Sequence, residues 1–177
     1  VKLPKSKTKH ILLWVLSVLF LAFLILPLPN IKPSYSKVLY SKEGILLSAT
    51  ISPEQQWCFP MDEEIPQKLT DCIITYEDEY FSYHPGINPV AITKAMIENI
   101  KAGKTIRGAS TIPMQVIRKK NKHAHRNWYN KIKETIGAIK YSLTHRDKTI
   151  LREWCEIAPF GGNTIGIKAA SLRYFGR

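Results

Sequence analysis

The longest apolar segment of the chain lies near its amino end. Between residues 11 and 28 there is no charged side chain, and only Ser17 and Pro27 interrupt the apolar run. A helix needs about 20 mainly apolar residues to cross a bilayer, so this run predicts one transmembrane anchor over 11–28. The lysine-rich tail 1–10 before it predicts a cytoplasmic amino terminus, with the rest of the chain on the outer, periplasmic or extracytoplasmic side of the cytoplasmic membrane. A cleaved signal peptide is the alternative, but the run is long for one and no A-x-A site follows.

Two different patterns follow the anchor. Short apolar stretches at 38–40 and 45–51 predict a small β-hairpin within a linker over 29–65. From Pro66 onward the apolar positions recur at helical spacing, and proline suits the first turn of a helix. The pattern therefore predicts a mainly α-helical domain over 66–177, preceded by a small β-hairpin linker and one N-terminal transmembrane helix.

The first helix of this domain, predicted over 66–81, carries an acidic residue on its apolar face. At about 100° per residue, Glu77 falls about 40° from Ile73, whereas Asp78 and Glu79 turn progressively away. A glutamate in that position needs a cleft beside it, and partial burial would suit its carboxylate to accept a proton. The alternative is a solvated acidic end of the helix.

Positive charge is concentrated in one stretch of the chain. Residues 118–148 hold ten Lys or Arg and two acids, a surplus of eight out of the net charge of +12. Such a surplus favours an anionic partner, and an extracytoplasmic location argues against nucleic acid. The three cysteines, Cys58, Cys72 and Cys155, have no metal-ligand spacing and are predicted to be buried or half-buried thiols, with a Cys58–Cys72 bridge left open.

Three motifs resemble those of a known family. Residues 77–86 follow the pattern E-D-x-x-F-x-x-H-x-G, and residues 108–115 follow G-x-S-T-I-x-x-Q, which by itself would be an ordinary Ser/Thr cap of a helix. Residues 130–134 follow R-K-x-x-E, with Asn130 at the arginine position. Over roughly 36–177 the chain thus resembles glycosyltransferase family 51, the peptidoglycan glycosyltransferase domain of class A penicillin-binding proteins.

A fourth motif is matched with changes. Residues 150–156 are similar to the family stretch I-L-E-x-Y-L-N, and the positions that depart from it or from the lysine before it are Asp147, Arg152, Trp154 and Glu156. Residues 52–60, 158–163 and 169–176 resemble the penicillin-binding protein 1C type. The family's fifth motif would lie beyond Arg177 and no transpeptidase domain is present, so the resemblance predicts a C-terminally truncated or partial domain.

The resemblance implies a fold and roles for residues. It implies a lysozyme-like fold in which Glu77 is the general base and Glu134 is a second carboxylate of the active cleft. Helical geometry alone would place Glu134 on the solvent face of its helix, opposite Ile132 and Ile136. The residues that the resemblance assigns to substrate binding are Asp78, Phe81, His84, Gly108, Ser110, Thr111, Gln115, Arg118, Arg126 and Lys131.

The resemblance also implies an activity in cell wall biosynthesis. The enzyme would polymerise lipid II into glycan strands and release undecaprenyl pyrophosphate, with lipid II, the nascent glycan chain, the inner membrane and other cell-wall synthesis proteins as partners. No metal motif is visible, although the chemistry leaves room for Mg²⁺ or another divalent cation at the pyrophosphate. Two alternatives remain, an inactive membrane-bound scaffold that binds lipid II and a lysozyme-like glycan hydrolase.

Overall fold

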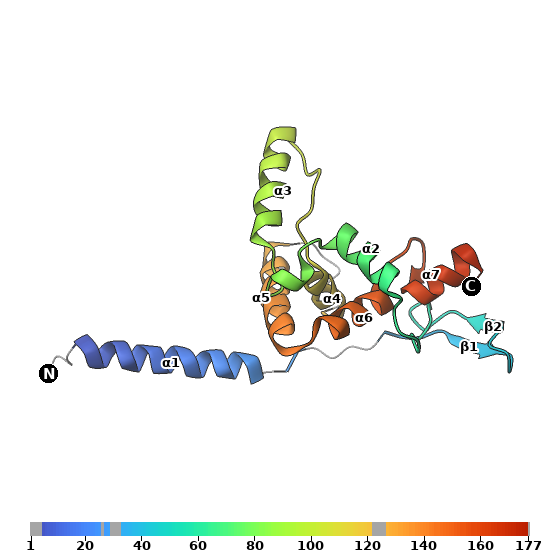
Figure 1. Ribbon diagram of the computed structural model, residues 1–177, viewed down its shortest axis with the longest axis horizontal. Coiled ribbons are helices and arrows are strands. Elements are labelled where there is room, and N and C mark those ends of the chain that lie inside the picture. Colours follow the sequence, from blue (N-terminus) through green and yellow to red (C-terminus); the bar gives the residue numbers. More distant parts are fainter. Residues whose placement is uncertain (1–4, 26, 29–32, 122–126, 177) are drawn as a thin grey trace.

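The computed structural model describes residues 5–25, 27–28, 33–121 and 127–176. Helices make up most of these residues, and the strands are few and short, which confirms a mainly helical chain with a small β-hairpin (Figure 1). In chain order the elements are α1 (Lys5–Ile25), β1 (Lys37–Tyr40), β2 (Leu46–Thr50), β3 (Trp57–Cys58), α2 (Gln67–Glu77), a 3-10 turn (Phe81–Tyr83), α3 (Pro89–Ala102), α4 (Ile112–Lys120), α5 (Trp128–Thr144), α6 (Asp147–Ile157), β4 (Thr164–Ile165) and α7 (Ile167–Phe175).

Helix α1 projects away from the body of the molecule, and only its carboxyl end approaches α5 (Figure 1). Its apolar part starts at Ile11 and the helix ends at Ile25, before Pro27, which has no amide hydrogen to continue a helix. Among the residues that the structure describes, no helix is long and apolar enough to cross a membrane. Helix α1 thus begins within the lysine-rich tail and is described as far as Ile25, whereas the predicted anchor covers 11–28.

The predicted β-hairpin is confirmed. Strands β1 and β2 pair antiparallel, with Lys37 opposite Thr50 and an irregularity between Leu39 and Tyr40. Gly44 has a φ of 81° in the turn, a left-handed conformation that glycine adopts without steric cost. The hairpin lies at the end of the molecule opposite α1 (Figure 1).

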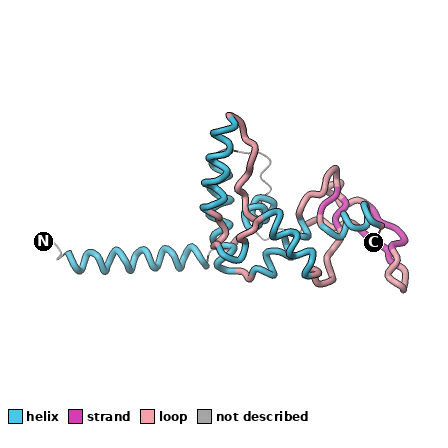
Figure 2. The backbone as a smooth tube through the Cα atoms, turned by 45° about the horizontal axis from the view of Figure 1, so that its top comes forward, coloured by secondary structure: helices cyan, strands magenta, loops and turns pink. Residues whose placement is uncertain are grey.

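A second, parallel strand pair ties the segment before α2 to the end of the chain. Trp57 pairs with Thr164 and Cys58 with Ile165 (Figure 2). Ser36 reinforces this joint, because its amide donates to the Cys58 carbonyl at 2.7 Å and its hydroxyl accepts from the Cys58 amide at 3.1 Å. Part of the predicted linker over 29–65 therefore packs against the helical domain.

The core forms around α4, which lies between α5 and α6. Ile112, Val116 and Ile117 are almost fully buried there. Helix α5 comes close because residue 137 is a glycine: a Cβ at that position would lie 2.8 Å from the Ile117 Cγ2 atom. Any larger residue at 137 would therefore have to displace the Ile117 side chain or the helix that carries it.

The buried face of α5 is the opposite of the one that its apolar pattern predicts. Ile132 and Ile136 are about half exposed, whereas Glu134, Ala138 and Tyr141 are buried. The prediction that Glu134 faces solvent, made from helical geometry alone, is wrong. The reason is that α5 packs its small and polar side against α4 and leaves Ile132 and Ile136 outside.

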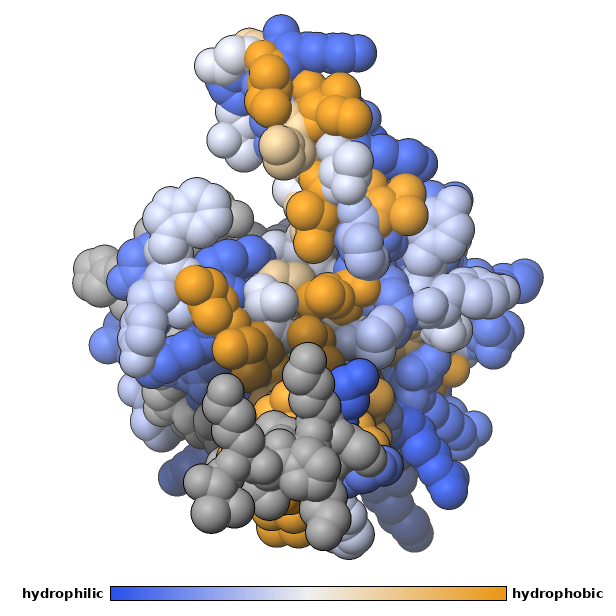
Figure 3. Space-filling view, turned by 90° about the vertical axis from the view of Figure 1, so that its left-hand side faces the viewer, coloured by the Kyte–Doolittle hydropathy of each residue, from blue (hydrophilic) through white to orange (hydrophobic). Residues whose placement is uncertain are grey.

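Helix α3 stands out from the body, and much of its apolar surface has no cover. Figure 3 shows apolar surface on this projecting helix and again on the body beneath it. The large apolar side chains exposed on α3 are Val90, Ile92, Met96, Ile97 and Ile100.

Candidate active site

The first predicted motif begins where α2 ends. The helix stops at Glu77, about four residues before the predicted end at 81, because Asp78 leaves the helical conformation with φ −161° and ψ 73°. Asp78 is buried rather than turned toward solvent. Its Oδ1 lies 2.9 Å from the His84 Nε2, and its Oδ2 accepts from the Ile112 amide at 3.0 Å. Both oxygens therefore tie the loop after α2 to the start of α4.

A glycine and a threonine complete this connection. Thr111 caps α4 by accepting from the Met114 amide, and its hydroxyl donates to the Gly86 carbonyl at 2.6 Å. Gly86 has a φ of 87°, and a Cβ there would lie 2.3 Å from the Ala138 carbonyl oxygen of α5. The cap predicted within 108–115 is thus Thr111, which leaves the neighbouring Ser110 beside the cleft described next.

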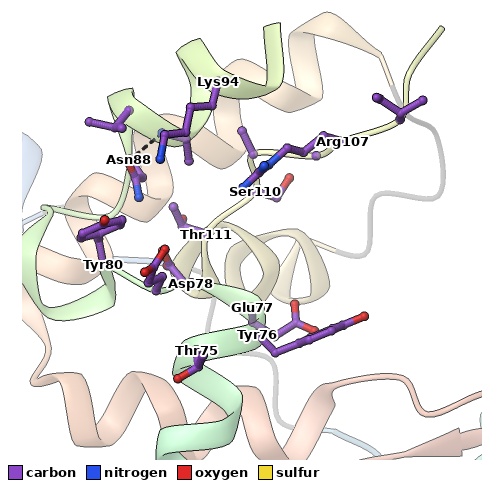
Figure 4. Close-up of a pocket in the computed structure, with 16 residues that line it drawn as sticks. Thr75, Tyr76, Glu77, Asp78, Tyr80, Asn88, Lys94, Arg107, Ser110 and Thr111 are labelled. Atoms are coloured by element: carbon purple, nitrogen blue, oxygen red, sulfur yellow. Dashed lines mark hydrogen bonds between the residues drawn. The ribbon is translucent and has the colours of Figure 1, made fainter. Parts of the chain in front are cut away.

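A cleft of about 420 Å³ opens between the end of α2, the first part of α3 and residues 106–111. Figure 4 places Glu77 on one side of this space, and Lys94 and Arg107 on the other. The predicted site residues that line it are Glu77, Asp78, Gly108, Ser110 and Thr111.

The other lining residues were not predicted as site residues from the sequence, and four of them bring an aromatic ring or a cation to the cleft. They are Tyr76, Tyr80, Lys94 and Arg107. Tyr76 is 88% exposed although its position on an ideal α2 helix predicts an apolar face. No signal in the sequence could have identified the two cations, because they lie on α3 and the loop after it, outside every recognised motif.

The Glu77 carboxylate is held by a side chain from another helix. Gln115 of α4 donates from its Nε2 to the Glu77 Oε2 at 2.8 Å. The Gln115 Oε1 in turn accepts from the indole Nε1 of Trp154 on α6, at 3.0 Å. Glu77 is half-buried at the edge of the cleft, so its position combines access for a ligand with a fixed neutral donor.

The second predicted carboxylate lies deeper. Glu134 is 5% exposed, and its Oε2 is 3.6 Å from the Lys131 Nζ. The same Lys131 Nζ donates to the Ser110 hydroxyl oxygen at 2.9 Å, and Ser110 lines the cleft. Lys131 therefore connects the buried Glu134 to the wall of the cleft, although neither residue lines it.

The other predicted site residues have different positions. Phe81 is buried in the hydrophobic core, and His84 pairs with Asp78. Arg118 is half-buried on α4 and does not line the cleft. Arg126 lies outside the described residues.

The basic stretch 118–148 does not form one continuous exposed surface. Lys120 is buried, with its Nζ 2.6 Å from the Glu153 Oε2 and 4.6 Å from the Tyr141 ring centroid. Burial, followed by the neighbouring Glu153 carboxylate, raises the pKa of Tyr141. Lys140 is also buried, with its Nζ 5.2 Å from the Phe23 ring centroid. Part of the positive charge thus stabilises the body of the domain and cannot meet a ligand.

Within the part of the chain that the structure describes, no group of three or more His, Cys, Asp or Glu side chains could hold a metal ion. Glu134 offers one carboxylate, and Lys131 already lies beside it. These residues do not fit a dedicated divalent-cation site.

Two departures from the fourth motif interact with each other. The Arg152 Nε lies 3.8 Å from the Glu156 Oε1, and the Tyr35 hydroxyl donates to the Glu156 Oε2 at 3.0 Å. Asp147 is the first residue of α6, where a carboxylate interacts favourably with the helix dipole. These changes therefore have structural partners outside the cleft.

Comparison with known proteins agrees with this arrangement. The sequence profile of a family described as transglycosylase matches residues 43–177. The chain belongs to the transglycosylase family. This confirms the family that the motifs predict, and the match begins within the predicted linker, before α2.

Individual members of the transglycosylase family are similar over most of this chain. Penicillin-binding protein 1C of Escherichia coli (strain K12) is 31% identical over 153 residues, which cover 86% of this chain and 20% of that protein. Penicillin-binding protein 1A of Aquifex aeolicus (strain VF5) is 32% identical over 145 residues, 82% of this chain and 20% of that protein. The chain thus spans about a fifth of these relatives. The biosynthetic peptidoglycan transglycosylase of Haemophilus influenzae (strain PittEE) is 31% identical over 173 residues, 97% of this chain and 70% of that protein.

Proposed function

We propose that this domain is a peptidoglycan glycosyltransferase that polymerises lipid II. The observation that carries the proposal is the Glu77 carboxylate at the edge of the cleft, fixed by Gln115, with cations on the facing wall. A base on one side and cations on the other suit a reaction in which a hydroxyl loses a proton while an anionic group departs. The family of the relatives supports the same chemistry.

The proposed reaction is an inverting displacement. The Glu77 carboxylate takes the proton of the 4-hydroxyl of the acceptor N-acetylglucosamine as this oxygen attacks C1 of the donor N-acetylmuramic acid. The C1–O bond to pyrophosphate breaks, its electron pair stays with the pyrophosphate oxygen, and undecaprenyl pyrophosphate leaves. Because the base and the leaving group act on opposite sides of C1, the configuration at that carbon inverts.

The cleft offers positive charge for the departing pyrophosphate. Lys94 and Arg107 line it directly. Lys131 reaches it through Ser110, whose hydroxyl oxygen is 2.9 Å from the Lys131 Nζ. Glu134, 3.6 Å from that ammonium group, holds Lys131 in place. Charge-assisted hydrogen bonds of this kind stabilise phosphate oxygens more strongly than neutral donors do.

The proposal places the domain at a membrane surface, on its outer side, in a lysozyme-like arrangement. A polyprenyl substrate stays in the lipid, so the cleft has to approach the headgroups. The exposed apolar side chains of α3 and the exposed rings of Trp128 and Tyr129 on α5 support this location. Flotation of the protein with phosphatidylglycerol vesicles tests it, and protein that stays at the bottom of the gradient would contradict the location.

Polymerisation of labelled lipid II by the purified chain in detergent tests the reaction. We expect polymer that lysozyme digests, and no polymer from Glu77→Gln. Binding of lipid II without turnover by the unmodified chain would point to a scaffold. Cleavage of preformed glycan would point to a hydrolase.

A further inference from the structure

One buried side chain contacts the site without reaching the cleft. Trp154 on α6 is 6% exposed and does not line the cleft. Its indole nitrogen lies 3.0 Å from the Gln115 Oε1. The chain of hydrogen bonds runs from Trp154 through Gln115 to Glu77, across α6, α4 and α2.

The chemistry of the indole group fixes the direction of this chain. An indole N–H can only donate, so the Gln115 atom that faces Trp154 has to be the amide oxygen. The amide nitrogen then faces Glu77 and donates to its carboxylate. If the Gln115 amide turned over, its nitrogen would face the indole N–H and its oxygen would face the carboxylate, which would leave donors opposed on one side and acceptors on the other.

We propose that Trp154 is a positioning residue, which fixes the orientation of the Gln115 amide and so holds the Glu77 carboxylate ready to accept a proton. This inference rests on the proposed role of Glu77 as the base. A hydrogen bond donated to a carboxylate favours its charged form, which is the form that a base needs. The donor also limits the rotamers of Glu77 at the edge of the cleft.

The sequence adds a reason why the residue type matters. Trp154 stands where the fourth family motif has a tyrosine. A tyrosine hydroxyl both donates and accepts, so it would tolerate either orientation of the amide. The tryptophan in this chain allows only the orientation that presents a donor to Glu77.

Trp154→Phe removes the donor and keeps an aromatic ring in the core. We expect the rate of lipid II polymerisation to fall about tenfold with a smaller change in KM, because Trp154 does not line the cleft. We also expect the acid limb of the rate profile to move to higher pH, because the carboxylate loses the hydrogen bond that favours its charged form. Trp154→Tyr, which restores a group able to donate, should move the acid limb part of the way back.

Tyr141→Phe is the matched control. Tyr141 belongs to the same core cluster, but its hydroxyl neighbours Glu153 and not Gln115. Its removal should leave the pH profile in place. If Trp154→Phe shifted the profile no further than Tyr141→Phe, the proposed positioning role would be wrong.

A second variant and a second measurement separate this inference from folding and from the proposed function. Replacement of Trp154 by β-(3-benzothienyl)alanine keeps the shape of the indole and removes only the N–H. The titration of the Glu77 carboxyl carbon, followed by 13C NMR in the full chain and assigned with Glu77→Gln, needs no turnover. An upward shift of its midpoint in this variant supports the positioning role, and an unchanged midpoint overturns it. A native chain that makes no polymer would contradict the proposed function alone.

Discussion

The two glutamates of the site are of one residue type and have opposite surroundings. Glu77 is the last residue of α2, lines the cleft and meets a neutral amide. Glu134 lies within α5, is buried and sits beside the ammonium group of Lys131. In the proposed function, Glu77 is accessible to a substrate hydroxyl, whereas Glu134 would act on the site through a neighbouring cation.

In the proposed function, this difference would separate proton transfer from charge balance within one domain. A base needs access and a carboxylate that is not already neutralised by a close cation. A carboxylate that orients a cation needs burial, because water weakens their interaction. The position of each glutamate on its helix decides which role it can take.

The largest effect is expected at Glu77. Glu77→Gln keeps the shape of the side chain and removes its ability to take a proton, so the rate of polymerisation should fall at least about 100-fold. The rate is measured with labelled lipid II, and circular dichroism should show an unchanged fold. A Glu77→Gln variant that keeps most of its rate would remove the basis for calling the two glutamates different.

The next largest effect is expected on stability, at Gly86 in the loop after α2, which packs against the helix that carries Glu134. Gly86→Ala adds a Cβ against the backbone of α5 at a positive φ, so the free energy of unfolding should fall by about 3 kcal/mol. Gly103→Ala is the control, because Gly103 also has a positive φ but has open space around it. It should cost about 1 kcal/mol. Equal losses in urea unfolding would mean that the contact between the loop and α5 contributes nothing.

A smaller effect on turnover is expected at Glu134. Glu134→Gln removes the charge beside Lys131 and leaves its shape, so KM for lipid II should rise about tenfold through a less well oriented Lys131. Glu64→Gln provides the comparison, because the Glu64–Lys148 pair is fully exposed and its loss should not change KM. A Glu134→Gln variant in which the rate falls as far as in Glu77→Gln, with KM unchanged, would give both glutamates the same role.

The smallest effect is expected on the reactivity of the cysteine thiols, which tests how closely the helices that support Glu77 are packed. Burial raises the pKa of Cys155, next to Trp154, to about 12, and burial raises that of Cys58 to about 11. Cys72 is exposed on α2, the helix that ends at Glu77, so the prediction of a buried or half-buried thiol is wrong for this residue. Near pH 8, iodoacetamide should therefore modify Cys72 first, because the other two thiols are shielded and almost entirely protonated. Peptide mass mapping follows the order, and fast modification of Cys155 would mean that the support of Trp154 is open.

The features that could be predicted from the sequence are those that depend on a local pattern of residues or on resemblance to a motif. The hairpin, the family and the position of Glu77 at a cleft are all found. The end of α2 was missed because Asp78 leaves the helix to bond the Ile112 amide, 34 residues away along the chain. Contacts over such separations leave no periodic signal in either segment.

The buried face of α5 was missed for a different reason. Its isoleucines form a regular apolar stripe, which usually marks the core side of a helix. Here the small Gly137 allows close packing with α4, and this contact decides which side is buried. Ile132 and Ile136 of this stripe stay exposed, as do the large apolar side chains of α3.

The parallel pairing of β3 with β4 has a practical consequence for anyone who shortens this chain. Tyr35 and Glu156 are 121 residues apart in sequence, yet their side chains form a hydrogen bond. Strand β3 is the partner of β4 in a two-stranded sheet. A fragment that starts at residue 66 would lose that strand and expose the edge formed by Thr164 and Ile165. Expression of the catalytic unit therefore calls for a start upstream of Tyr35, and a protease cut between β2 and α2 should leave two pieces that stay together.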